Sequence, residues 1–190
     1  MSLSYAILGS LSTAPSSGYD LARLFDTGLG WFWSAAHSQI YPELKKLEER
    51  GLVESVSTTV GEKLEKRMYA ITQTGLDELK AWTESPPQYR PNRDPERLQF
   101  IFSDLFGAEN IREHLELHKQ HHEARLRQLT QTRGAMQDRQ HERVNERLKG
   151  RTKKQQELTL LLRKLAYDGD IRRAEHEIAW ADEALKALGV

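Results

Sequence analysis

The side chains with the clearest potential for chemistry are three regularly spaced histidines. His114, His118 and His122 stand four residues apart, so on a helix they share one face. Two histidines at that spacing can chelate zinc. No acidic residue completes a metalloprotease pattern around them, and we therefore predict no metal site. A structural or solvated helix face is the favoured interpretation; a metal site and a surface that titrates near neutral pH are the alternatives.

Other catalytic patterns are missing from the sequence. The 190 residues include no cysteine, which excludes disulfides, thiol catalysis and thiolate metal sites. They contain neither a glycine-rich phosphate loop nor a G-x-S-x-G nucleophile motif. We therefore predict a protein that is not an enzyme and that carries no cofactor.

A polar helix face after residue 36 suits contact with a nucleic acid. Ile40, Leu44 and Leu47 have the spacing of one buried helical stripe. The opposite face is free to enter a major groove, where a glutamine can pair with adenine. We predict that Ser38 caps this helix and that Gly51 ends it. The predicted DNA-facing residues of the helix are His37, Ser38, Gln39, Tyr41 and Lys45.

The neighbouring elements must position that helix. Two helices precede it, separated by a turn at Pro15 to Gly18. Two segments rich in β-branched residues follow it and form a hairpin, after which Thr72 caps a fourth helix. This order predicts a winged helix-turn-helix, whose wing directs Lys66 and Arg67 at phosphates. The predicted helices cover about 3–11, 19–25, 38–50 and 72–82, and the strands 52–60 and 67–71.

Charge does not by itself predict DNA binding. The chain has 28 basic and 28 acidic residues, and residues 1–85 hold 8 basic against 11 acidic side chains. A net charge of −3 is not the basic block typical of nucleic-acid binding. DNA binding must therefore rest on local placement of the basic groups. A helical adaptor whose winged helix contacts another protein is the alternative function.

A proline-rich segment divides the chain. Four prolines stand between Ser85 and Pro95, and they forbid a continuous helix there. We predict a winged helix domain over 1–85, a linker over 86–94 and an all-helical domain over 95–190. The expected fold class is thus mainly α. No segment has the length and hydropathy of a membrane span, and no signal peptide is evident, so we expect a cytoplasmic protein.

Three sequence blocks in the first domain resemble the PadR family of winged-helix transcriptional regulators. They are MSLSYAILGSLSTAPSSGYDLARLF, HSQIYPELKKLEERGLVES and KRMYAITQTGLDEL. The His-Ser-Gln opening of the third helix and the long helical C-terminal region are similar to the AphA-like subgroup. The resemblance implies a repressor that binds an inverted-repeat operator in double-stranded DNA as a homodimer and answers to a small aromatic effector. In the Gly-Tyr-Asp of the first block, Tyr19 is placed to donate to a phosphate, or alternatively to pack in the core.

The C-terminal region supplies candidates for the dimer interface. Asp94 and Pro95 mark a helix start. The residues that follow are apolar on more than one face, so other helices or a second chain must bury them. Leu158 to Leu165 predict a buried helix, and Asp168 to Asp170 predict a turn. A regular apolar seam then runs through the last helix. We predict that Leu98, Phe102, Ile171, Ile178 and Leu185 contribute to a homodimer.

Two tryptophans are candidates for an effector pocket. Trp31 and Trp33 flank Phe32, and aromatic side chains bind flat organic ligands well. The favoured alternative is that they plug the joint between the winged helix and the C-terminal helices and have no ligand.

Overall fold

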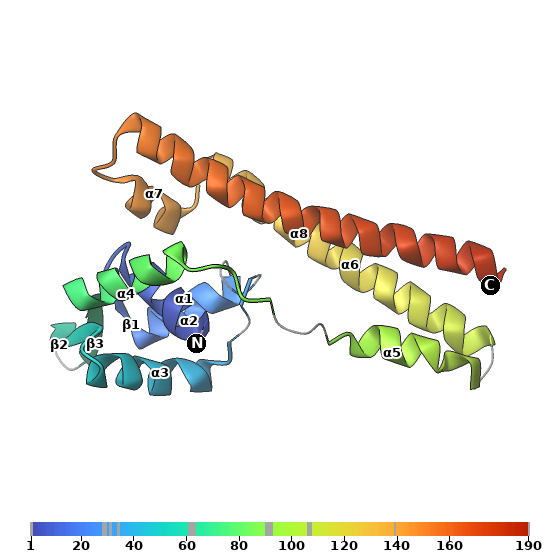
Figure 1. Ribbon diagram of the computed structural model, residues 1–190, viewed down its shortest axis with the longest axis horizontal. Helices are drawn as coiled ribbons and strands as arrows, with labels where there is room; N and C mark the ends of the chain where they lie inside the picture. The colour runs from blue at the N-terminus through green and yellow to red at the C-terminus, as the bar shows by residue number, and fades with distance from the viewer. Residues whose placement is uncertain are drawn as a thin grey trace. The chain divides into compact units, whose positions relative to one another are not determined.

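The computed structural model describes residues 2–27, 30, 32–33, 35–60, 64–89, 93–105, 108–138 and 140–189. The chain divides into two compact units, residues 1–87 and residues 88–190 (Figure 1). The division falls in the proline-rich segment. Each unit is considered on its own below. In the described part of the chain, no helix combines the length and the apolar character that crossing a membrane requires.

The first unit is a winged helix-turn-helix. A small antiparallel sheet with strand order β1-β3-β2 accompanies its helices, so the predicted fold class is confirmed. The hairpin strands pair in register from Val53 opposite Ile71 to Val60 opposite Leu64. The elements are α1 (Ser2–Leu11), β1 (Ser16–Ser17), α2 (Gly18–Thr27), α3 (His37–Glu49), β2 (Val53–Val60), β3 (Leu64–Ile71) and α4 (Gln73–Glu84).

The strand β1 corrects the predicted turn at Pro15 to Gly18. Ser16 and Ser17 pair with Tyr69 and Met68 of β3 and extend the wing hairpin into a sheet. Both serines are buried, and the Ser17 hydroxyl donates to the carboxylate of Asp20 at 2.7 Å. A two-residue strand has no periodicity of its own, so only its pairing with a distant segment reveals it.

The core of the first unit is made by one stripe from each of its first three helices. The helix α3 contributes Ile40, Leu44 and Leu47, all fully buried as the spacing predicted. Tyr69 and the start of β2 close the core from the sheet side. The remaining buried members are Ile7, Leu8, Leu11, Leu21, Ala22, Phe25, Leu52 and Val53.

The ends of α3 confirm one prediction and correct another. Gly51 follows the helix with φ of 67°, the left-handed conformation that glycine adopts most easily. The N-cap, however, is Ala36, and Ser38 lies inside the first turn with an exposed side chain. The side chain of Gln39 explains the shift, because its Oε1 accepts the backbone N–H of Ala36 at 3.1 Å. A side chain inside the helix thus replaces the predicted serine cap.

The helix α4 begins at the predicted cap. The Thr72 hydroxyl accepts the backbone N–H of Gly75 and donates to the carbonyl of Gly51. Only glycine fits at position 75, because a Cβ there would lie 2.1 Å from the carbonyl oxygen of Leu52. The cap and the glycine together seat α4 against the start of β2.

The second unit is helical throughout its described elements. The Asp94 side chain accepts the backbone N–H of Arg97, and Pro95 opens the first helix, as predicted. The elements are α5 (Pro95–Ile101), the 3₁₀ helix η2 (Ser103–Leu105), α6 (Ala108–Gln137), α7 (Glu142–Leu148) and α8 (Lys153–Leu188).

The turn predicted at Asp168 to Asp170 is wrong, because α8 runs through it without a break. Free carboxylates favour turns by hydrogen bonding to nearby backbone. Both carboxylates are engaged elsewhere: Asp168 binds Arg133 and Lys164, and Asp170 binds Arg125 and Arg173. These ion pairs leave Gly169 in a helical position.

The helices α6 and α8 pack against each other in opposite directions. Ion pairs join Lys119 to Asp182 near one end and Arg133 to Asp168 near the other. On α6 the seam consists of the buried Leu115, Leu129 and Met136, which stand at multiples of seven residues. The helix α8 contributes the buried side chains Tyr167, Ile171, Ala174 and Ala181.

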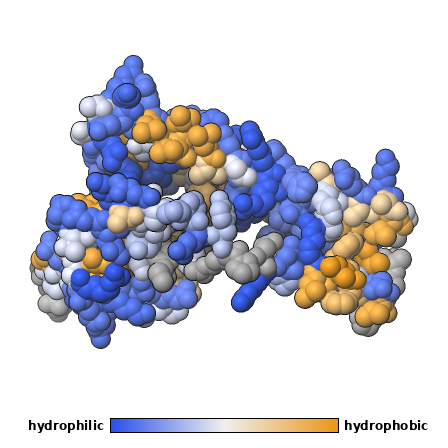
Figure 2. Space-filling model, in the orientation of Figure 1, coloured by the Kyte–Doolittle hydropathy of each residue, from blue (hydrophilic) through white to orange (hydrophobic). Residues whose placement is uncertain are grey.

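Two apolar faces of the second unit lie at its surface. On α8, Leu158, Leu161, Leu162 and Leu165 form one stripe, and each is 50–59% exposed. The prediction that they are buried is therefore wrong for the single chain. Apolar side chains also gather on α5 and η2, at Leu98, Ile101, Phe102 and Leu105. Figure 2 shows both patches, over the N-terminal half of α8 and around α5.

Candidate nucleic-acid interface

The outward face of α3 is polar and accessible. His37, Ser38, Gln39, Tyr41 and Lys45 are all exposed, on the side of the helix opposite its buried stripe. The buried stripe fixes the rotation of α3 about its own axis, so these side chains are held outward by the core. This is the presentation that a major-groove recognition helix requires.

Two of these side chains are already engaged. The Oε1 atom of Gln39 caps the helix through the Ala36 N–H, which fixes the plane of its amide. His37 Nε2 lies 2.8 Å from a carboxylate oxygen of Asp26 on α2. Asp26 was not predicted as a site residue, since nothing in the sequence pairs it with a residue eleven positions later. These contacts position the first turn of α3.

Two exposed tyrosines border this surface. Tyr19, at the start of α2, is 59% exposed, so the alternative in which its ring packs in the core is excluded. Tyr41 on α3 is 53% exposed and lies over Gly18, where a Cβ would stand 2.5 Å from its ring. The absence of a side chain at Gly18 thus lets α2 and α3 approach at the point where both present a tyrosine.

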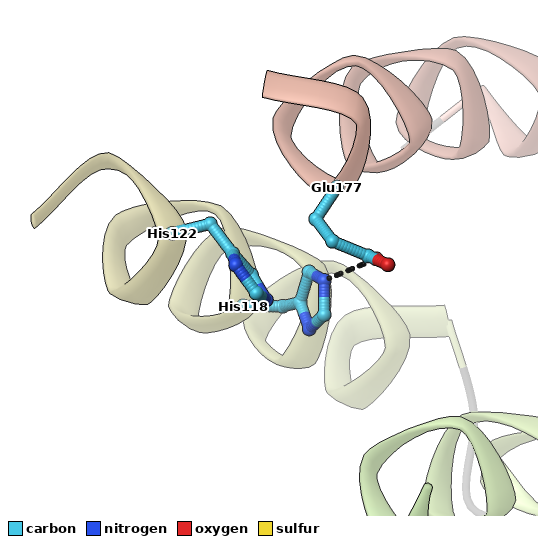
Figure 3. A group of neighbouring side chains, drawn as sticks. All are labelled: His118, His122 and Glu177. Atoms are coloured by element: carbon cyan, nitrogen blue, oxygen red, sulfur yellow. Dashed lines mark hydrogen bonds and ion pairs between the residues drawn. The ribbon is translucent and has the colours of Figure 1, made fainter. Parts of the chain in front are cut away.

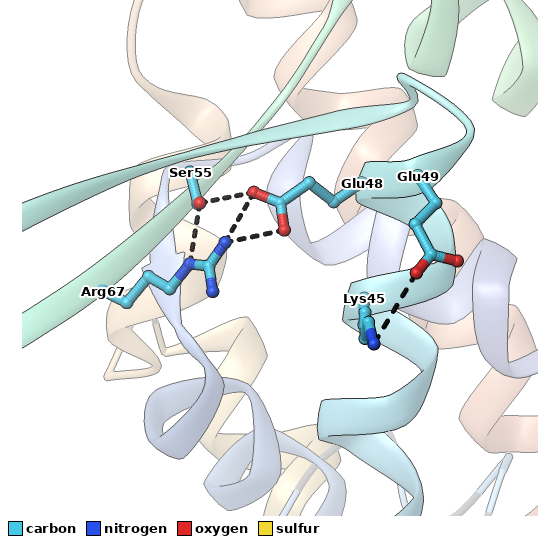
Figure 4. Close-up of polar contacts among 5 residues, drawn as sticks. All are labelled: Lys45, Glu48, Glu49, Ser55 and Arg67. Atoms are coloured by element: carbon cyan, nitrogen blue, oxygen red, sulfur yellow. Dashed lines mark hydrogen bonds and ion pairs between the residues drawn. The ribbon is translucent and has the colours of Figure 1, made fainter.

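Two described basic residues of the interface, Lys45 and Arg67, have acidic partners. Lys45 lies 3.8 Å from Glu49, one turn along α3. Arg67 of the wing donates to both oxygens of Glu48, at 2.8 and 2.7 Å, and to the hydroxyl of Ser55 (Figure 4). The hydrogen bond from Ser55, with a further contribution from Arg67, lowers the pKa of Glu48 despite its partial burial. Glu48 therefore fastens the wing to α3.

The remaining predicted residues of the first unit are placed as follows. Lys66 lies in β3 opposite Thr58, and its side chain is outside the described part of the chain. Trp31 is also outside the described residues. Trp33 is half-buried and packs against the core of the first unit. This packing lies within the first unit, so the predicted joint with the C-terminal helices stays a prediction.

A recess in the second unit is too small for an aromatic ligand in this conformation. It lies between α6 and α8, where Arg133, Arg163 and Tyr167 are among its lining residues. Its volume of about 10 Å³ suits a single water molecule. Burial raises the pKa of Tyr167 to about 12, so its hydroxyl stays protonated at neutral pH.

The predicted dimer residues separate into two groups. Leu98 and Phe102 are each 55% exposed and open to a partner. Ile171 is buried within the chain, and Ile178 and Leu185 are half-buried on α8. The α8 seam thus serves mainly the contact with α6.

One cluster of side chains in the second unit has the composition of a metal site. His118 and His122 on α6 converge with Glu177 on α8, and their ligand atoms lie within 4.8 Å of one another (Figure 3). His118 Nε2 is 3.2 Å from the Glu177 carboxylate. The histidine spacing was visible in the sequence. The carboxylate was missed because it comes from a helix 59 residues away from His118.

The fold and the exposed face of α3 define the class of protein, a winged helix-turn-helix with a helical C-terminal unit. Residues 7–81 match the transcriptional regulator PadR-like family, and residues 92–189 match the virulence activator alpha C-terminal domain. The chain belongs to the PadR-like family of transcriptional regulators, in the form that carries this C-terminal domain. The resemblance found in the sequence is thereby confirmed.

Curated relatives match part of the chain. The chain is 54% identical over 80 residues to the negative transcriptional regulator PadR of Bacillus subtilis (strain 168), covering 42% of this chain and 44% of that protein. It spans about half the length of the curated relatives it matches.

Solved structures extend the similarity to nearly the whole chain. B. subtilis PadR in complex with operator DNA has a TM-score of 0.77 and 28% identity, and 99% of each chain is covered. The same protein in complex with p-coumaric acid has a TM-score of 0.70, 27% identity and 99% coverage of each chain. The Vibrio cholerae virulence activator AphA has a TM-score of 0.67 and 28% identity, with 98% of each chain covered.

Proposed function

We propose that this chain is a DNA-binding transcriptional repressor that binds an inverted-repeat operator as a homodimer and releases it when a small aromatic effector binds. The observation that carries the proposal is the polar, exposed face of α3, held outward by the buried Ile40, Leu44 and Leu47. A helix presented in this way fits a major groove.

The relatives support repression over activation. The chain is 54% identical over 80 residues to a negative regulator, whereas over nearly its whole length its identity to the PadR and AphA structures is the same, 28%. PadR has been crystallised with operator DNA, and this chain follows that structure over 99% of its length. We infer that the present chain uses the same unit for the same kind of ligand.

Within this proposal, each group of residues has its own task. The side chains at the start of α3 read base edges or adjacent phosphates, and the wing contacts the sugar-phosphate backbone. Gln39 is the residue that pairs bidentately with adenine. The proposed DNA contacts are Tyr19, His37, Ser38, Gln39, Tyr41, Lys45, Lys66 and Arg67.

The proposed homodimer is held by residues 95–190, which a linker over 86–94 joins to the DNA-binding domain of 1–85. Two-fold binding to an inverted repeat needs two copies of α3 about one duplex turn apart. The exposed leucines of α8, together with Leu98 and Phe102, provide apolar surface for the second copy. Such a contact removes from water the stripe that the single chain leaves exposed.

The effector step is proposed from the complex of PadR with p-coumaric acid. A small aromatic effector releases DNA only if it binds the DNA-free form more tightly than the DNA-bound form. We propose Trp31 and Trp33 as its first candidate contacts. The chain acts by binding and not by catalysis, and it works in the cytoplasm, where its operator lies.

The experiment is a fluorescence anisotropy titration of the full chain with a labelled duplex from its own promoter region. We expect saturable binding of one dimer per inverted repeat and at least about 10³-fold weaker binding to a scrambled duplex. Equal affinity for both duplexes contradicts the proposal and favours the protein-binding adaptor. Adding phenolic acids to the preformed complex tests release separately.

A further inference from the structure

The cluster formed by His118, His122 and Glu177 has no part in the proposed function. We propose that these three residues bind a divalent transition-metal cation of the zinc type. The proposal concerns the second unit alone and stands independently of DNA binding.

The geometry of the cluster is close to that of a metal site. His118 and His122 are one helical turn apart on α6, with ring centroids 4.4 Å from each other. The three ligand atoms lie within 4.8 Å of one another, and tetrahedral zinc ligands are about 3.3 Å apart at ordinary bond lengths. Side-chain rotations therefore suffice to close the site, because α6 and α8 are already packed together.

The cluster is partly shielded from water, and one of its nitrogen atoms lacks a hydrogen bond. The side chains of His118 and Glu177 are only 18% and 20% exposed. His122 Nδ1 is buried and has no hydrogen-bond partner among the described residues. A buried ring nitrogen without a hydrogen-bond partner is unfavourable. A metal ion bonded to the lone pair of His122 Nδ1 supplies the missing partner.

Arg97 on α5 is the natural competitor for this site. Its guanidinium donates to Glu177 Oε2, the same oxygen that His118 contacts. Arg97 also lies over the Trp180 ring, at 3.3 Å from the centroid, and 3.8 Å from Asp94. It therefore keeps partners when the carboxylate turns to the metal through Oε1. Its positive charge lowers the affinity of the site for a cation but does not prevent the cation from binding.

The donor set selects the class of cation. Two imidazoles and one carboxylate suit Zn²⁺, Ni²⁺, Co²⁺ or Cu²⁺, whereas Mg²⁺ and Ca²⁺ require mostly oxygen ligands. Three protein ligands leave the fourth position to water. Because the ligands come from α6 and α8, the cation cross-links the two helices and stabilises the folded second unit.

The experiment uses the full chain, stripped of metal by chelator dialysis and titrated with Co²⁺ and then with Zn²⁺. Wild-type protein should bind about one Co²⁺ per chain with the intense visible absorption of a low-coordinate site, and Zn²⁺ should displace it. Calorimetry measures the Zn²⁺ affinity, and thermal unfolding should shift upward with Zn²⁺ but not with Mg²⁺.

Matched variants locate the ligands. His122→Gln and Glu177→Gln should weaken Zn²⁺ binding by more than about tenfold. His121→Gln changes an exposed neighbour on the same helix and should bind Zn²⁺ as the wild type does. Arg97→Gln removes the competing cation and should bind Zn²⁺ more tightly. The proposal is overturned if wild-type protein shows no Co²⁺ absorption, or if His122→Gln binds Zn²⁺ as tightly as His121→Gln.

Discussion

Gln39 accepts the backbone N–H of Ala36 through its side-chain Oε1, at 3.1 Å, so the amide proposed to read a base also caps the helix that carries it. A carbonyl oxygen has two lone pairs and can accept a second hydrogen bond. The cap therefore orients the amide before DNA arrives. Because one side chain both contacts the base and caps the helix, a single variant of Gln39 reports its contribution to operator affinity and its contribution to stability.

We predict that Gln39→Ala weakens binding to the specific operator by about 1–3 kcal/mol, with little change on random DNA, because adenine loses its bidentate partner. The same variant should lose about 0.3–1.5 kcal/mol of unfolding free energy with the cap. Anisotropy titrations and urea unfolding measure the two effects. Ser38→Ala leaves the cap bond intact and should not lower stability. An equal loss on both DNAs would show that Gln39 only positions the protein.

Arg67 should become a stronger phosphate contact when Glu48 loses its charge. In Glu48→Gln the bond that holds Arg67 against α3 is weakened, and the guanidinium is free to turn to DNA. We expect tighter binding to all sequences and a salt dependence of log K steeper by up to about 0.9 per subunit. Glu54→Gln removes an exposed charge on β2 without touching Arg67 and should leave the slope unchanged.

Removing the wing cations should have the opposite effect. The double change Lys66→Ala with Arg67→Ala should weaken binding to operator and random DNA alike, because phosphate contacts carry no sequence information. If half the contacts form in a two-subunit complex, the salt slope becomes flatter by up to about 2 units. Titrations at several salt concentrations provide the slope. No change in slope would mean that the wing does not touch phosphate.

The leucine stripe on α8 should hold the dimer. We expect Leu161→Asp with Leu165→Asp to convert a dimer, near twice 21.9 kDa, to a monomer that keeps its helix content, since both side chains are exposed in the single chain. Light scattering and circular dichroism measure the two properties. Lys153→Asp, off the stripe, should remain dimeric. Ile171→Ala should instead cost about 2–5 kcal/mol of stability, because this residue is buried within the chain.

The second unit should lose stability in mild acid through His141. Burial, assisted by Arg163, lowers the pKa of His141 from its ordinary value of 6.5. The unfolded chain then takes up a proton more readily than the folded one. The contribution of His141 to stability is complete above pH 6.5 and falls as the pH drops from there toward the lowered pKa. Urea midpoints should therefore fall less between about pH 7.5 and 5.5 in His141→Gln than in His176→Gln, which alters an exposed histidine.

The first unit was largely predictable because its signals are local. The buried stripe of α3, the left-handed Gly51 and the Thr72 cap each depend on residues within a few positions of one another. The cap of α3 was missed because alanine has no cap side chain, and the substitute comes from Gln39 inside the helix. The N-cap propensity of serine alone favoured Ser38, two residues after the actual cap.

The second unit was less predictable because its decisive contacts join distant residues. Asp168 and Gly169 have the composition of a turn, and the ion pairs that engage the carboxylates include distant partners, such as Arg133, which lies 35 residues before Asp168. The seam on α8 is regular, yet its periodicity cannot say whether α6 or a second copy covers it. For the same reason, the sequence did not show that Glu177 lies beside His118 and His122.

The link from Arg67 through Glu48 to Ser55 has a consequence for the speed and strength of recognition. It joins the base of the hairpin to the recognition helix, so these two elements meet DNA as one preorganised body. The conformational entropy of bringing them together is lost during folding and not during association, which offsets part, but not all, of the phosphate contact that Glu48 withholds from Arg67. A hairpin without this link would have to find its orientation on the duplex each time it bound.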